Sequence, residues 1–231
     1  MSDWFVFFTK SLPAFWQGLL VTLELTLVSL IMGLVLGLFA ALGRTYGGVW
    51  ARRISVGYIE LFRGTPLLVQ LFLVYYGLPG LGITLSRMTS AFIALGLNSG
   101  AYQAEYFRGA ILAIGQGQMM AGRSIGLSRW NTIRYVILPQ ALRLAIPSWS
   151  NEPISLLKST AIAFLIAVPD LMTKAKVIAA RTYDPIGTYL AVAVVYLAAV
   201  ALLSELLKYL ERRVRIPGME LEGKKTGIAS K

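Results

Sequence analysis

Two side chains that carry much of protein chemistry are missing from this chain, which has 231 residues but no cysteine and no histidine. The absence of cysteine excludes disulfide bonds, and the absence of both excludes ordinary zinc sites and histidine-based acid–base chemistry. The carboxylates, serines and lysines that remain form no catalytic motif. We therefore expect no catalytic residue, no bound metal and no enzyme activity in this chain.

Charge is also scarce. Charged residues make up 14% of the chain and hydrophobic residues 56%, whereas a soluble domain carries roughly 25% charged residues. Residues 64–86 and 186–203 contain no charge, and a helix needs about 20 apolar residues to cross the bilayer core. The sequence predicts an all-α polytopic membrane protein whose five transmembrane helices cover residues 17–43, 56–79, 88–112, 144–168 and 186–208.

The positions of the basic residues predict the orientation in the membrane. The net charge of +11 is typical of nucleic-acid-binding proteins, but the basic residues lie between and after the apolar runs, as in cytoplasmic loops. If the N-terminus is outside, the inner segments 44–53, 113–143 and 208–231 hold 14 basic residues and the outer segments hold 5. We expect contact with membrane lipid and not with nucleic acid, an outer N-terminus and a cytoplasmic C-terminus. Residues 1–215 would form the transmembrane domain, and residues 216–231 a flexible cytoplasmic tail.

The predicted cytoplasmic loop at residues 115–143 is too polar to span the membrane. Gly126 can end a short helix, Ser128 can cap the next one, and Pro139 predicts a bend on the return to the membrane. Met120-Ala121-Gly122, then Gly126, then the run from Val136 to Pro139 have the spacing of a known loop signature.

This loop resembles the "EAA" loop of the permease subunits of bacterial ABC importers, although Met120 replaces the family's glutamate and Gly122 its second alanine. In that family the loop forms a coupling helix that docks on the ATPase. The resemblance implies the fold of type I ABC importer transmembrane domains, with a coupling segment at 115–130. It assigns ATPase coupling to Met119, Met120, Ala121, Gly122, Arg123 and Gly126.

Further motifs resemble the polar amino-acid branch of the same family. They include residues 63–70, 101–109, 138–143, 150–152 and 157–161. The run 157–161 resembles the corresponding run in one of the two permeases of histidine, lysine and arginine importers. The resemblance implies a bacterial inner-membrane location, import of a polar and specifically basic amino acid, and alternating access. It also implies a second, non-identical permease, two ABC ATPase subunits and an extracytoplasmic amino-acid-binding protein. ATP and magnesium would bind the partner ATPase, because residues 218–225 only approach the P-loop pattern and have Lys225 where it requires Ser or Thr.

Polar residues inside the predicted spans are candidates for the solute path, because ionisable groups in a bilayer are costly. At 100° per residue, the polar residues of the fourth span share one sector. In the third span, Asn98, Tyr102 and Glu105 stack on one side. The solute path is predicted to include Asn98, Tyr102, Glu152, Ser155, Lys158 and Ser159. The alternative is that these groups only hold helices together, at about 0.6 kcal/mol for each contact, for instance through a Lys158–Glu152 or Lys158–Glu105 ion pair.

Two Glu-x-x-Arg pairs, Glu60–Arg63 and Glu105–Arg108, lie near the predicted inner edge. We expect gate or interface ion pairs there, and not solute ligands. Gly33 and Gly37 form a small-xxx-small pair that favours close helix contact. Two alternative functions are an ion-gradient-driven secondary transporter, which should show inverted repeats, and a membrane assembly subunit without transport activity.

Overall fold

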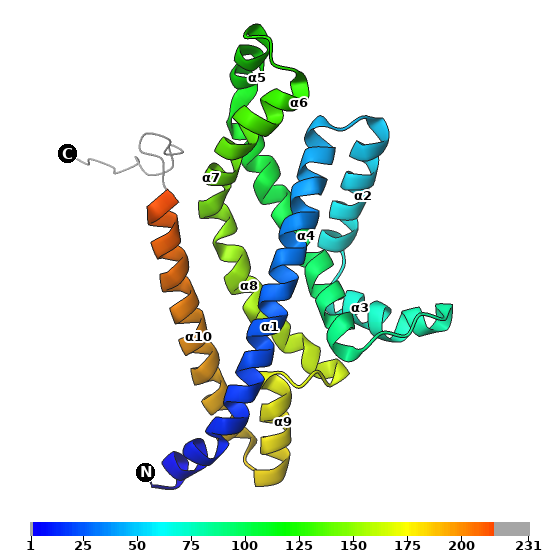
Figure 1. The fold of residues 1–231 in the computed structure, drawn as a ribbon. Helices are drawn as coiled ribbons and strands as arrows, with labels where there is room; N and C mark the ends of the chain where they lie inside the picture. Colours follow the sequence, from blue (N-terminus) through cyan, green and yellow to red (C-terminus); the bar gives the residue numbers. More distant parts are fainter. Residues whose placement is uncertain (1, 215–231) are drawn as a thin grey trace, which may run out of the picture.

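The structure is a computed structural model that describes the backbone of residues 2–214 and the side chains of residues 11–214. It is almost entirely helical, as predicted. Long helices lie side by side, and α5 and α6 are at the end of the molecule opposite to α9 (Figure 1). The expected tail at 216–231 lies outside the described residues.

Two long, continuous helices begin and end the described chain. Helix α1 covers Ser2–Tyr46 and α10 covers Pro185–Val214. Their stretches Ser11–Tyr46 and Pro185–Val214 are both long and apolar enough to cross a membrane. The predicted spans 17–43 and 186–208 therefore each fall within one uninterrupted helix.

The predicted second span is broken. Helix α2 (Val49–Gly64) ends before Thr65 and Pro66, and α3 (Leu67–Phe72) continues through two irregular turns, η1 (Leu73–Gly77) and η2 (Leu78–Leu81). The two parts, Val49–Gly64 and Leu67–Leu81, meet at 106°. Proline disfavours helical geometry at the residue before it, and Thr65, which precedes Pro66, is extended (φ −118°, ψ 146°). One straight helix over 56–79 is therefore not what the chain forms.

The middle of the chain forms α4 (Arg87–Ala113), α5 (Gly115–Ser124) and α6 (Arg129–Thr132). After a wide turn, η3 (Ile133–Ile137), the chain returns as α7 (Leu138–Trp149), α8 (Asn151–Ser159) and the tighter turns of η4 (Thr160–Ile166). The interruption at Ser150 agrees with the sequence, since Pro147 and Pro153 both disfavour a regular helix there. Helix α9 (Leu171–Thr182) begins at Asp170, whose Oδ1 accepts a hydrogen bond from the Thr173 amide at 2.8 Å.

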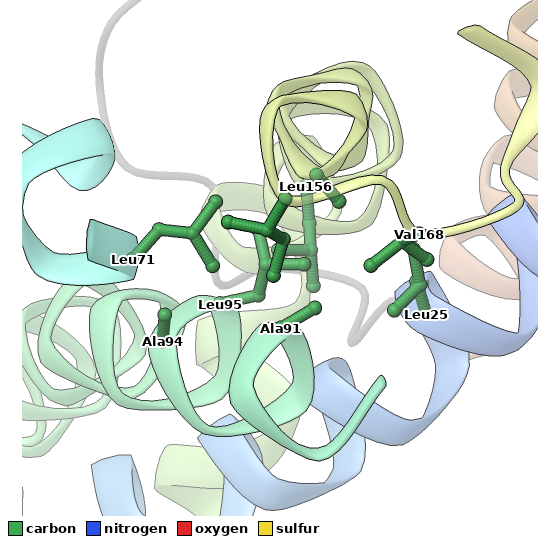
Figure 2. Close-up of a cluster of buried hydrophobic side chains, with 9 residues drawn as sticks. Leu25, Leu71, Ala91, Ala94, Leu95, Leu156 and Val168 are labelled. Atoms are coloured by element: carbon green, nitrogen blue, oxygen red, sulfur yellow. The ribbon is translucent and has the colours of Figure 1, made fainter. Parts of the chain in front are cut away.

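The largest apolar core joins α1, α3, α4 and the α8–η4 segment. Leu25, Leu71, Leu95, Leu156 and Val168 pack there with small alanines of α4 (Figure 2). These residues come from four separate parts of the chain. Their packing therefore holds α3, which follows the break after α2, against α4 and α8.

The count of five spans is not confirmed. In the part of the chain that the structure describes, two helices are long and apolar enough to cross a membrane, or up to four segments if each bent pair is one span; the second bent pair is Asn151–Ile166 with Leu171–Thr182, at 52°. Helix α4 contains the predicted third span at 88–112 but is less apolar, since it carries Asn98, Ser99, Tyr102, Gln103 and Glu105. Asn98 and Tyr102 line the cavity of the candidate site, and the other three belong to hydrogen-bond and ion-pair networks beside it.

Candidate functional site

The break between α2 and α3 is held by side chains. The Gln70 Nε2 donates to the carbonyl oxygens of Phe62 and Thr65, at 2.9 and 3.0 Å, and Asn98 Nδ2 on α4 also donates to Phe62, at 3.1 Å. The same Asn98 nitrogen donates to Gln70 Oε1 at 3.1 Å. Freed carbonyls inside a membrane protein need such partners or a wet cavity, and here the amide side chains of Gln70 and Asn98 supply partners.

A cavity of about 560 Å³ lies directly beside this break. Its walls come from the end of α2 and the start of α3, from one face of α4 and from one face of α8. The lining is largely polar and consists of Arg63, Gly64, Thr65, Pro66, Leu67, Asn98, Tyr102, Tyr106, Glu152, Ser155, Leu156 and Ser159.

Five of the six residues predicted for the solute path line this cavity: Asn98, Tyr102, Glu152, Ser155 and Ser159. Lys158 does not line it, is exposed, and makes no ion pair with Glu152 or Glu105. The reason is helical geometry, because Lys158 lies about 120° around the helix from Glu152.

Glu152 is the buried acid of the cavity wall, with 6% of its surface exposed. Its Oε1 accepts a hydrogen bond from Ser99 Oγ at 2.7 Å. Gln103 continues this network, since its Nε2 donates to Ser99 Oγ at 3.0 Å and its Oε1 accepts from Trp149 Nε1 at 2.7 Å. Glu152 is thus fixed through α4 to α7, and only part of its carboxylate faces the cavity.

A second cluster lies beside the cavity, around Glu105. Arg108 donates to both carboxylate oxygens of Glu105 (2.7–3.2 Å), and Arg44 of α1 donates to Oε1 at 2.5 Å. Arg63 Nη1 is 4.0 Å from Glu105 Oε2, and its guanidinium lies 5.3 Å from the centre of the Tyr102 ring. The expected Glu105–Arg108 pair is present, whereas Arg63 pairs with Glu105 and not with the exposed Glu60.

The predicted coupling segment projects from one end of the molecule (Figure 1). Gly126 has φ +88° and follows α5, and Ser128 Oγ accepts from the Asn131 amide at 3.2 Å to begin α6, as predicted. Gly122 is buried against Thr132, whereas Ala121 and Arg123 are exposed. Met119 packs against the apolar cluster at the base, but Met120 is 64% exposed and Ile125 78% exposed. The end of this hairpin therefore presents apolar side chains to the outside.

Sequence reasoning missed several site residues. Tyr106 lies four residues after Tyr102 and therefore on the same face of α4, so helical spacing could have predicted its place in the lining. Gln70, Ser99 and Gln103 gave no such signal, because their roles depend on helices distant in the sequence. No group of three or more acidic residues that could hold a metal ion lies within the described residues.

Comparison with known proteins places the chain in a family. The model of the binding-protein-dependent transport system inner membrane component matches residues 33–216. The chain belongs to this family. The resemblance inferred from the loop and the helix motifs is thereby confirmed, and the protein is a multi-pass component of an inner membrane.

Two relatives of this inner membrane component are amino-acid permeases. The glutamine transport system permease protein GlnP of Escherichia coli (strain K12) is 40% identical over 216 residues, which cover 93% of this chain and 98% of GlnP. The L-cystine transport system permease protein TcyB of Bacillus subtilis (strain 168) is 42% identical over 206 residues, covering 87% and 88%.

A solved structure has the same fold. A chain in the crystal structure of an amino acid ABC transporter with histidines superimposes with a TM-score of 0.82 at 40% identity, covering 89% of this inner membrane component and 96% of that chain. The helical architecture is therefore that of ABC importer transmembrane domains.

Proposed function

We propose that this chain is the permease subunit of an ABC importer that moves a polar amino acid across the inner membrane by alternating access. The single observation that carries the proposal is the polar cavity walled by the α2–α3 break, α4 and α8. Membership in the family, and the amino-acid permeases among its relatives, support it.

The cavity suits a zwitterion. Glu152 supplies a carboxylate for the substrate ammonium group, and Arg63 supplies a guanidinium for the substrate carboxylate. Asn98 Oδ1 and the hydroxyl groups of Ser155 and Ser159 add neutral hydrogen-bonding groups. Among the described residues, Glu152 is the one acid that lines the cavity. Glu105 lies beside the cavity and is occupied by arginines. A neutral polar amino acid therefore fits the lining as well as the basic one that the sequence motifs suggested.

The hairpin of α5 and α6 is proposed to transmit work from a separate ATPase. Its exposed Met120 and Ile125 suit a hydrophobic groove on a partner subunit. ATP and magnesium would bind that partner, which carries out the hydrolysis. This chain would bind no cofactor itself, and Met119, Met120, Ala121, Gly122, Arg123 and Gly126 form or shape the coupling surface.

The remaining partners are proposed from the family resemblance. Helices of this chain wall the cavity. We propose that a second, non-identical permease supplies the facing wall and completes the path. Two ATPase subunits would dock on the two hairpins, and an extracytoplasmic amino-acid-binding protein would deliver the solute. We propose five passes, with α2–α3 and α4 counted as passes despite the break and the polar face, and with the N-terminus outside.

Reconstitution tests this function. Vesicles containing this chain with its co-purified subunits and a binding protein should take up a labelled amino acid only when ATP is present inside. Replacing Glu152→Gln should reduce uptake at least tenfold, since a lost hydrogen bond to a charged group is worth roughly 1.5–3 kcal/mol. Basal ATP hydrolysis and assembly should persist.

The matched control is Glu60→Gln, which changes an exposed acid of α2 outside the cavity and should leave uptake unchanged. Equal uptake by the Glu152→Gln variant and wild type would remove this cavity as the solute path. Uptake by the chain alone, driven by an ion gradient, would overturn the proposed transport class.

A further inference from the structure

A second polar cavity lies at the end of the molecule that carries the coupling hairpin. It has a volume of about 320 Å³ and is lined by Arg44 and Thr45 of α1, Arg52 of α2, and Arg108 and Leu112 of α4. Three guanidinium groups from three helices thus face one small space.

The positive charge around this cavity is only partly balanced. Glu105 is the carboxylate that binds Arg44 and Arg108, and its second oxygen also lies 4.0 Å from Arg63. Arg52 makes no side-chain hydrogen bond or ion pair within the described residues. Arg44 and Arg108 therefore share one carboxylate, whereas the Arg52 guanidinium has no anionic partner among the described residues.

The surroundings of the cavity are those of a membrane interface. On α1, Phe39 is exposed just before Arg44, and on α2 Val49, Trp50 and Ile54 are exposed on either side of Arg52. The Arg53 guanidinium lies 5.6 Å from the centre of the Trp50 ring. Tryptophan is enriched where the hydrocarbon core meets the headgroups, so arginines with exposed tryptophan and other apolar side chains beside them are typical of headgroup depth.

We propose that this cavity binds the phosphate group of an anionic phospholipid headgroup in the cytoplasmic leaflet, with Arg52 as its free donor and the exposed residues of α1 and α2 contacting the acyl chains. Basic pockets between helices on the cytoplasmic side are suited to such headgroups. Guanidinium groups suit phosphate because they can donate two parallel hydrogen bonds. The bound lipid would supply the anion that the protein lacks and would hold the ends of α1, α2 and α4 together.

The test uses the full-length chain purified in a neutral detergent and titrated with phosphatidylglycerol or phosphatidylcholine. Wild type should prefer phosphatidylglycerol. The Arg52→Gln variant should bind it at least tenfold more weakly, because it loses a charge-assisted hydrogen bond to the phosphate that only a residue of the cavity lining can make. Arg53→Gln is the matched control, because it removes the same charge one residue away without changing the cavity lining, and it should retain wild-type affinity.

Equal losses in the two variants would overturn the proposal, because they would show attraction to surface charge without a site. Equal binding of phosphatidylglycerol and phosphatidylcholine would also overturn it, because the cavity would then not select an anionic headgroup. Displacement of the lipid by low millimolar inorganic phosphate would instead identify a free-phosphate site. A second measurement uses unmodified protein: phosphatidylglycerol, but not phosphatidylcholine, should protect Arg52 from a guanidinium-modifying reagent, with modification read by mass spectrometry. Absence of protection would contradict the lipid assignment even if Arg52→Gln failed to fold.

Discussion

Arg63 and Lys158 are two cations close to the proposed solute path, but they have different surroundings. Both side chains are exposed, but Arg63 lines the cavity with its guanidinium over Tyr102, whereas Lys158 lies outside the lining. We therefore assign Arg63, and not Lys158, to the substrate carboxylate. Neutralising each cation in turn compares a residue of the lining with one outside it.

We predict that Arg63→Gln raises the KM for amino-acid uptake at least tenfold, because it removes a charged hydrogen-bond donor worth about 1.5–3 kcal/mol. Lys158→Gln should change KM less than twofold. Uptake kinetics in the reconstituted system check both values, with binding of the ATPase subunits as the control for assembly. A larger effect from Lys158→Gln would return that lysine to the solute path.

At the scale of helices, the contact between α1 and α4 depends on glycine. A Cβ atom at Gly37 would lie 2.8 Å from the carbonyl oxygen of Gly100 and from Cβ of Gln103. A Cβ at Gly33 would lie 2.6 Å from Gln103 Nε2, which also donates to the Leu30 carbonyl oxygen. These distances confirm that the small-xxx-small pair allows close contact.

We predict that Gly37→Ala destabilises the chain by about 1–3 kcal/mol through overpacking, which lowers the melting temperature by roughly 2–10 °C for a protein of this size. Gly57→Ala is the control, since a Cβ there meets nothing within 4 Å. That variant should melt at the same temperature or slightly higher, because alanine favours helix over glycine by about 1 kcal/mol. Equal melting temperatures for the two variants would contradict the close contact.

The turn of the coupling hairpin depends on Gly126, whose φ of +88° is unfavourable for other residues. Gly126→Ala should loosen this turn at a cost of about 1–2 kcal/mol and speed trypsin cleavage at Arg123 and Arg129. Gly117→Ala within α5 should leave cleavage unchanged or slower, because this glycine has ordinary helical φ and open space around it. Cleavage rates of the purified chain check this, and unchanged cleavage in Gly126→Ala would mean that another residue sets the turn.

The sequence predicts elements that depend on neighbouring residues better than elements that depend on contacts between distant parts of the chain. Local signals, Gly126 and the Ser128 cap, predicted the hairpin, and the prolines around Ser150 disfavour a regular helix where α7 meets α8. The sharp break after α2 was not predicted, because the uncharged run at 64–86 looks like one span, although Pro66 was a local signal for it. Its geometry depends on Gln70 and Asn98, which meet only after folding. The same limit hid the Arg44–Glu105 pair, which joins residues 61 positions apart.

The orientation of the whole molecule can be tested because the chain contains no cysteine. Ile83 lies in the exposed connection before α4, and Gln118 is exposed on α5. We predict that, in intact cells, a membrane-impermeant maleimide labels an Ile83→Cys variant and not a Gln118→Cys variant, which should react only after permeabilisation. The unmodified chain gives a zero background, and the opposite labelling pattern would invert the proposed topology.

The side-chain bonds at the α2–α3 break also bear on how the path changes shape. An ordinary helix must lose backbone hydrogen bonds before it opens, whereas here the carbonyl oxygens of Phe62 and Thr65 are held by two amide side chains. Exchanging those amides for a passing ammonium group, or for water, leaves α2 and α3 intact. We therefore expect the cavity wall to rearrange one residue at a time, with the ammonium group of the proposed cargo taking the place of the two amides.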